Sequence, residues 1–187
     1  MSVPPVVYEG VYGPYTVTGE HRREVLAYRL SLLLLALAQV ALLVQWRWLG
    51  PSWCWPWLLL MAAGLGGALR WVHIYLVPLH RTLQLFWLLG CAGFGLLAYR
   101  AGAASMLPQL VDQPVWIWLV GPFFAALAGL GFKEFFCFQR PEAIGLTLLL
   151  PLLLLGWWLG LWSAPVASVL LAAQSLLLMV LALRKFP

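Results

Sequence analysis

Six apolar runs occupy most of this chain of 187 residues, and each is long enough to cross a lipid bilayer as a helix. A helix needs roughly 17–25 predominantly apolar residues to cross a hydrocarbon core about 30 Å thick. The runs cover residues 26–45, 53–69, 83–99, 115–132, 143–161 and 165–183. We therefore predict an all-α membrane protein, built as a bundle of about six transmembrane helices.

The composition excludes a soluble globular domain. Hydrophobic residues make up 64% of the chain and charged residues only 9%, whereas soluble domains carry about 25% charged residues. The net charge of +5 would suggest nucleic acid as a partner for a soluble protein. In a membrane protein, the Lys/Arg excess of cytoplasmic loops explains it better. The predicted environment is thus the lipid bilayer, and no nucleic-acid partner is expected.

The distribution of Lys and Arg predicts the orientation. Six spans place both termini on one side, and nine of the eleven basic residues fall on that side. They are Arg22, Arg23, Arg29, Arg70, Arg81, Lys133, Arg140, Arg184 and Lys185, against Arg47 and Arg100 on the other side. Because cytoplasmic loops are enriched in Lys and Arg, we predict a multi-pass protein with both termini in the cytoplasm.

Residues 1–24 form the only substantial aqueous segment, ahead of a membrane domain over residues 25–187. The stretch VYEGVYGPYTVT alternates strand-forming residues around Gly13-Pro14, which predicts a small hairpin or an extended arm. Thr18 is then a candidate N-cap for the first helix. A two-stranded hairpin is marginal alone, so we expect this cytoplasmic arm to pack on the membrane domain or on a partner.

Small residues recur at a spacing of four within the spans, and two prolines lie inside them. The small-residue stripes are Ala63/Gly67, Gly64/Ala68, Gly121/Ala125/Gly129 and Gly156/Gly160. Such stripes allow helix backbones to approach closely in lipid, which favours packing within the bundle and leaves a homo-oligomer as the alternative. Pro122 and Pro151 are each expected to kink a helix.

The stretch RWVHIYLVPLHR, residues 70–81, concentrates polar side chains between two apolar runs. On a continuous helix His73 and His80 would lie about 10.5 Å apart along the axis, too far to bind one metal ion together, and Pro78 is expected to bend or end that helix. No metal site is predicted. A single contact from His73 or His80 to chlorophyll or haem remains an interpretation of this stretch.

A second polar stretch, KEFFCFQRPEA, covers residues 133–143 on the same predicted side. The two stretches are expected to meet in one polar cytoplasmic cluster that faces lipid phosphates. Its members are Arg70, Arg81, Lys133, Glu134, Arg140 and Glu142. The alternative is a functional site built from His73, His80, Glu134 and Cys137.

The acidic residues argue against an enzyme. All six Asp and Glu lie in the amino-terminal arm or in the predicted loops, whereas proton-coupled carriers and intramembrane hydrolases place ionisable residues inside the bundle. No Walker, HExxH or GxSxG motif is present. No catalytic residue is therefore assigned.

The segments RWVHIYLVPLHRTLQ and FKEFFCFQRPEAIGLTLLLPLLLLG resemble the signature segments of a family of uncharacterised integral membrane proteins. That family carries a domain-of-unknown-function label and occurs in cyanobacteria, with plastid relatives. The segment TGEHRREVLAYR is similar as well. The resemblance implies a multi-span helical protein of a cyanobacterial thylakoid or plasma membrane, and it implies no reaction.

Three functions follow as hypotheses. The first is a non-enzymatic accessory or assembly protein of a photosynthetic membrane complex, in contact with chlorophyll, carotenoid or haem. The second is a small transporter or channel, suggested by Pro122, Pro151 and the glycine-rich spans. The third is a membrane redox or lipid enzyme that uses His73, His80 or Cys137.

Overall fold

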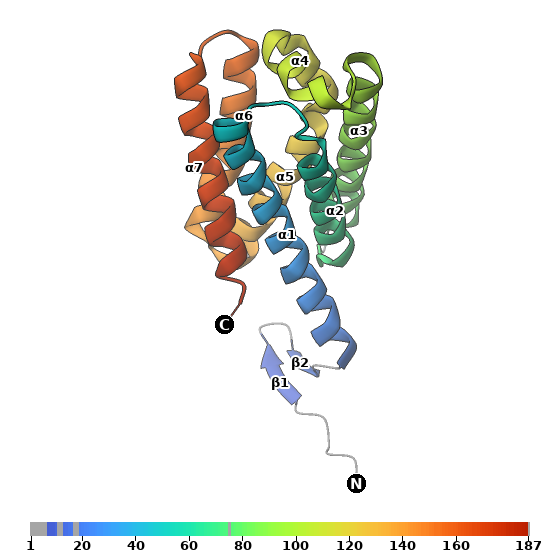
Figure 1. Cartoon of the computed structure of the whole chain (residues 1–187). Coiled ribbons are helices and arrows are strands. Elements are labelled where there is room, and N and C mark those ends of the chain that lie inside the picture. Colours follow the sequence, from blue (N-terminus) through green and yellow to red (C-terminus); the bar gives the residue numbers. More distant parts are fainter. Residues whose placement is uncertain (1–6, 11–12, 17–18, 75, 187) are drawn as a thin grey trace.

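The protein is described here by a computed structural model that covers residues 7–10, 13–16, 19–74 and 76–186. Seven α-helices follow a short hairpin (Figure 1). The helices are α1 (Gly19–Leu49), α2 (Trp55–Trp71), α3 (Val77–Ala101), α4 (Met106–Asp112), α5 (Ile117–Phe138), α6 (Pro141–Trp158) and α7 (Ala164–Leu183). Each predicted span overlaps one long helix, and the short α4 is an element that the hydropathy pattern did not predict.

The six long helices form a ring in which each helix packs on its neighbour in the chain. α1 packs on α2, α2 on α3, α3 on α5, α5 on α6 and α6 on α7, and α7 closes the ring against α1. Neighbouring helices run antiparallel, so both termini lie at one end (Figure 1). We call this end, where α1, α3 and α6 begin, the base of the bundle, and the opposite end the top.

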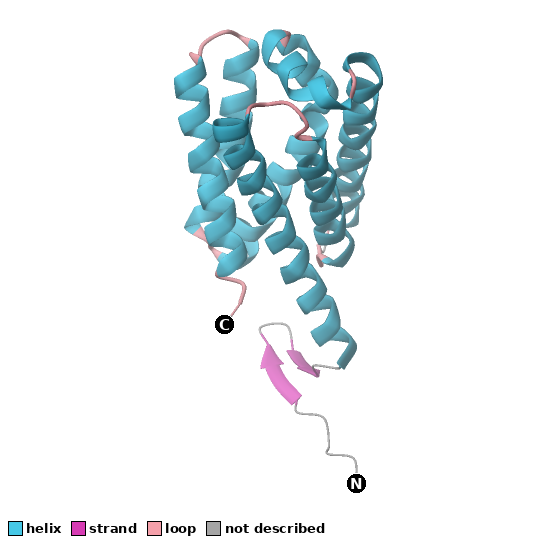
Figure 2. Ribbon diagram, viewed as in Figure 1, coloured by secondary structure: helices cyan, strands magenta, loops and turns pink. Residues whose placement is uncertain are grey.

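Length and composition confirm the predicted class, an all-α membrane protein. Five helices are long and apolar enough to cross a membrane: α1, α3, α6, α7 and the segment Pro114–Phe138, which contains α5. α2 has 17 residues, at the lower limit for crossing a hydrocarbon core. It lies in the ring with the others (Figure 2), but the count of six spans stays a prediction.

The amino-terminal hairpin is confirmed. β1 (Val7–Gly10) pairs antiparallel with β2 (Gly13–Thr16), and Tyr8 lies opposite Tyr15. The predicted cap Thr18 lies outside the described residues. α1 already begins at Gly19, so the last part of the predicted arm is helical and continues directly into the first span.

Proline and glycine set several helix ends. Pro78 lies in the first turn of α3, where its missing N–H costs no hydrogen bond. The prediction that a single helix does not continue through RWVHIYLVPLHR is thus confirmed. At the top, α6 ends at Trp158 rather than at the predicted residue 161. Gly160 there has φ +70°, a left-handed conformation that terminates helices, so Gly160 does not extend a packing stripe.

Glycines let two helix pairs approach at backbone distance. A Cβ added at Gly64 on α2 would lie 2.7 Å from the backbone nitrogen of Leu35 on α1. On α3, a Cβ at Gly90 would collide with the backbone of Phe123, and one at Gly93 with the carbonyl oxygen of Leu119 on α5. Packing within the bundle therefore uses Gly64 as predicted, and also a glycine pair on α3 that the stripe analysis did not name.

Candidate functional site at the base of the bundle

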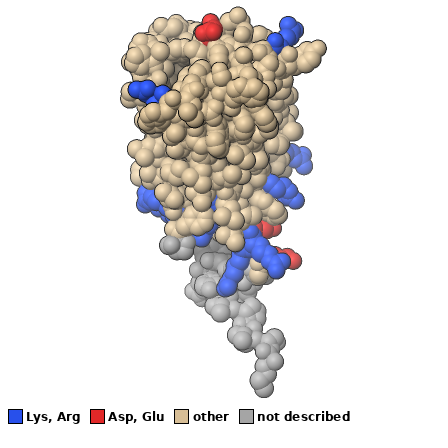
Figure 3. Space-filling view, in the orientation of Figure 1, with Lys and Arg blue, Asp and Glu red and all other residues tan. Residues whose placement is uncertain are grey.

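Charged side chains gather at the base. The nine basic residues assigned to one side by sequence lie at this end, while Arg47 and Arg100 lie at the ends of α1 and α3 near the top. On the face shown in Figure 3, most Lys and Arg lie in the lower part, and few charges lie near the top. The base contains two distinct groups of polar residues, described in turn below.

The first group surrounds Glu134, whose side chain is fully buried near the end of α5. Tyr28 on α1 donates its hydroxyl hydrogen to Glu134 Oε1. Lys133 Nζ lies 3.2 Å from the same oxygen, and Lys185, just beyond α7, pairs with Oε2. Buried charges are stable only when paired and hydrogen-bonded. We call Tyr28, Lys133, Glu134 and Lys185 the Glu134 cluster; it connects α1, α5 and the end of α7.

An aromatic ring also contacts the ammonium groups of Lys133 and Lys185. Lys185 Nζ lies 4.0 Å from the centroid of the Phe138 ring, and Lys133 Nζ lies 4.8 Å from the same centroid. Both distances fall within the range of cation–π attraction. Burial lowers the pKa of the Lys185 ammonium from its usual value, and the Glu134 carboxylate opposes that shift. The cluster is thus a compact ion-paired contact rather than a solvated rim.

A second ion pair lies beside this cluster. Arg184 Nη1 donates to Glu142 Oε2 at 2.8 Å, joining the end of α7 to the first turn of α6. Of the local pairs that the stretch 133–143 allows, Lys133–Glu134 forms. In the part of the chain that the structure describes, the other ion-pair partners of the two buried glutamates are Lys185 and Arg184 rather than Arg70, Arg81 or Arg140. The carboxyl-terminal segment therefore occupies the place that had been expected for the stretch 70–81.

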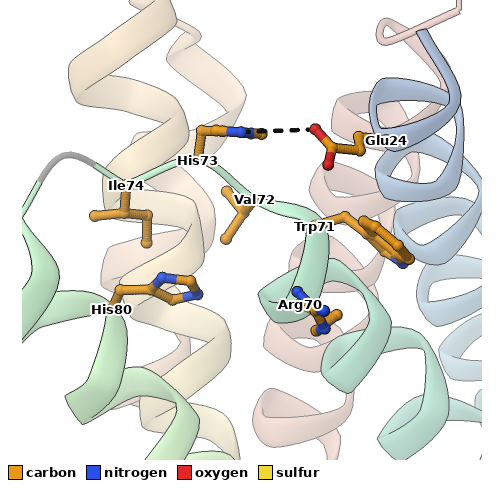
Figure 4. Close-up of a pocket in the computed structure, with 7 residues that line it drawn as sticks. All are labelled: Glu24, Arg70, Trp71, Val72, His73, Ile74 and His80. Carbon is orange, nitrogen blue, oxygen red and sulfur yellow. Dashed lines mark ion pairs between the residues drawn. The ribbon is translucent and has the colours of Figure 1, made fainter. Parts of the chain in front are cut away.

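The second group lines a cavity of about 240 Å³ on another part of the base. Glu24 comes from α1, Arg70 and Trp71 from the end of α2, His73 from the linker, and His80 from the first turns of α3 (Figure 4). The buried Val72 and the half-buried Ile74 complete the lining. We call this cavity the histidine pocket.

The two histidines are held differently. His80 Nε2 lies 2.6 Å from the carbonyl oxygen of Leu69. Because a carbonyl only accepts, Nε2 carries the hydrogen and Nδ1 is the second polar atom of that ring. His73 is far more exposed, with 77% of its side chain accessible, and its Nε2 lies 3.7 Å from Glu24 Oε2. His80 is thus a fixed wall of the pocket, and His73 lies at its mouth.

The structure brings only some of the predicted site residues together. Arg70, His73 and His80 share the histidine pocket, whereas Cys137 and Glu134 lie on α5 and do not line it. Arg81 and Arg140 do not line this pocket, and neither takes part in an ion pair between described residues. Across those residues, no group of three His, Cys, Asp or Glu side chains is arranged to hold a metal ion.

Sequence reasoning missed a polar contact inside the bundle. Gln39 of α1 donates from Nε2 to Gln174 Oε1 and, at 2.7 Å, to Ser175 Oγ on α7, and all three side chains are buried. Gln39 Oε1 and Gln174 Nε2 find no hydrogen-bond partner among the described residues. An amide in the middle of each of the apolar runs 26–45 and 165–183 was the available signal, because polar residues in such runs usually join helices.

This amide contact gives a direct prediction. Gln39→Leu removes the partner of Gln174 and leaves a buried amide unpaired, which costs roughly 1–3 kcal/mol. The double variant Gln39→Leu/Gln174→Leu should recover most of that loss, because two apolar side chains of similar size need no partner. Thermal unfolding in detergent, followed by circular dichroism, measures the difference. A double variant that loses the sum of the two single losses would show that the two amides act independently and would contradict the prediction.

The ring of apolar helices, with nine basic residues at the base and two near the top, defines a helical integral membrane protein. A family model described as uncharacterised integral membrane protein (DUF2301) matches residues 67–187. The chain belongs to this family, as the resemblance of its two polar stretches indicated. No curated protein and no solved structure matches the chain.

Proposed function

We propose that the protein is a non-enzymatic accessory or assembly subunit of a membrane complex. The observation that carries this proposal is the use of the buried polar side chains, which connect helices to one another. Glu134 and Glu142 bind lysine and arginine side chains, and Gln39 binds Gln174. These side chains stabilise the packing of the helices on one another. This supports a scaffold role, in which partners bind to the outer surface of the bundle.

The setting proposed for this subunit is a thylakoid or plasma membrane of a cyanobacterium, with both termini in the cytoplasm. The nine-to-two distribution of Lys and Arg supports the orientation. The family resemblance of the two polar stretches is the basis for the photosynthetic setting. In this setting the partner is a pigment-carrying complex, and contact with chlorophyll, carotenoid or haem is part of the proposal.

An apolar groove near the top supports contact with a flat or elongated hydrophobic molecule. It has a volume of about 320 Å³ and lies between α3, α5 and α6. Trp118 and Trp158 line it and pack edge to face, with ring centroids 5.1 Å apart. Pro122 and Pro151 also line it, so the two residues that suggested a transporter both border an apolar surface rather than polar groups.

The test is purification from native membranes in mild detergent, with an absorption spectrum and mass spectrometry on the same peak. Pigment bands together with co-purifying membrane subunits support the proposal; a colourless protein without partners contradicts it. Gly121→Leu adds a larger side chain at the groove, and its Cβ meets nothing within 4 Å. Gly95→Leu, at an equally open position on α3, is the matched control. Bound pigment should fall in the first variant only.

A further inference from the structure

We propose that the histidine pocket binds the headgroup of a phospholipid, with its phosphate at Arg70 and a hydroxyl group of the same headgroup at Glu24. This site goes beyond the accessory role and does not depend on it. The ligand class is a phosphoglycerol headgroup, which combines an anionic phosphate with hydrogen-bond donors.

The size of the pocket fits a headgroup. Three elements and the linker between α2 and α3 enclose about 240 Å³, below the roughly 300–1,000 Å³ of sites that enclose a drug-sized ligand. A phosphate with a short polyol is a small group, whereas a haem or chlorophyll ring is larger than such a cavity. The volume therefore favours a headgroup over a pigment ring at His73 and His80.

Arg70 provides the phosphate contact. Its guanidinium lies 5.2 Å from the centroid of the Trp71 ring, within the range of cation–π attraction. Arg70 takes part in none of the ion pairs between described residues. Its N–H groups are therefore able to donate to a ligand. Arginine presents a planar fork of N–H groups that matches phosphate oxygens.

Glu24 and the histidines determine which headgroup fits. A carboxylate repels a bare phosphate but accepts hydrogen bonds from hydroxyl groups, so Glu24 favours a headgroup with donors beyond the phosphate. Figure 4 shows Glu24 and His73 facing each other across the mouth of the pocket, with His80 deeper on the α3 side. His80 is anchored through Nε2 to Leu69, which leaves Nδ1 to accept a hydrogen bond from a ligand hydroxyl.

The position of the pocket fits a lipid of the surrounding bilayer. It lies at the base among the end of α2 and the start of α3, next to Trp71, and tryptophan prefers the depth of the headgroups.

The experiment uses the full chain, purified and delipidated in detergent. Phosphatidylglycerol is titrated into the micelles while the unfolding temperature is followed, and native mass spectrometry counts the bound lipids. We expect a saturable rise in unfolding temperature with one tightly bound lipid. Arg70→Gln should weaken this binding about tenfold or more. Arg81→Gln, a change of the same charge outside the pocket, should leave it unaltered.

Further arms identify the ligand and can overturn the proposal. Phosphatidylmethanol carries the same single negative charge as phosphatidylglycerol but no hydrogen-bond donor, so it should bind more weakly to the wild type, and Glu24→Gln should reduce that difference. Equal losses in Arg70→Gln and Arg81→Gln would mean general attraction to anionic lipid and would overturn the site. An equal response to glycerol phosphate or inorganic phosphate would replace the lipid by a soluble phosphate compound.

Discussion

Glu134→Gln should destabilise the protein by about 3–5 kcal/mol, because it removes the carboxylate that neutralises two buried lysines. Lys133 and Lys185 are only 9% and 12% exposed, so neither ammonium group can regain full hydration without opening the base. The glutamine Oε1 can still accept from the Tyr28 hydroxyl, so the expected loss comes from the two lysines. The measurement is the unfolding transition in detergent, followed by circular dichroism.

Two further variants separate the buried charge from a general effect of lost acidity. Glu20→Gln changes an exposed carboxylate in the first turn of α1 and should shift the transition by less than about 0.5 kcal/mol. Glu134→Gln combined with Lys185→Met removes one of the unpaired charges and should recover part of the loss. If Glu134→Gln and Glu20→Gln unfold alike, the Glu134 cluster does not stabilise the base.

Gly93→Ala should cost about 3 kcal/mol, at the upper end of overpacking effects. Its new Cβ would collide with the carbonyl oxygen of Leu119, a backbone atom that cannot move aside by rotating a side chain. α3 and α5 would then have to separate along their contact. Thermal unfolding in detergent measures the loss of stability. We also expect a lower yield of folded protein.

Gly95→Ala is the matched control for this prediction. Gly95 lies on the same helix, two residues further on, and a Cβ there meets nothing within 4 Å. Alanine favours the helix over glycine by up to about 1 kcal/mol, so this variant should be neutral or slightly more stable. Equal destabilisation by both variants would contradict close contact between α3 and α5.

The sequence was sufficient to predict the helices because bilayer thickness sets their length and hydropathy reveals it directly. It also predicted the hairpin, from its alternation around Gly13-Pro14, and the break at Pro78. α4 was not predicted, because Met106–Asp112 is too short and too mixed in polarity to be recognised as a membrane span. The close contact at Gly93 was not predicted, because it depends on which helix faces Gly93. The spacing of residues within α3 does not contain that information.

The candidate site was less predictable for a related reason. The polar residues themselves were evident, but their partners depend on the closure of the ring. Tyr28 and Glu134 are 106 residues apart, and Lys185 was counted only as one more basic residue at the expected cytoplasmic face. The histidines were considered unable to act together on a straight helix. The break after Trp71 folds His80 back beneath the linker, and both rings line one pocket.

The closure of the ring between α1 and α7 has a consequence for biosynthesis. Gln39 and Gln174 are 135 residues apart. At about 5–20 residues per second, the ribosome needs roughly 7–27 s to deliver the second amide after the first. Throughout that interval α1 presents an unpaired polar group and an open flank to its surroundings. During membrane insertion, α1 therefore lacks its contact with α7 until the last helix has been synthesised.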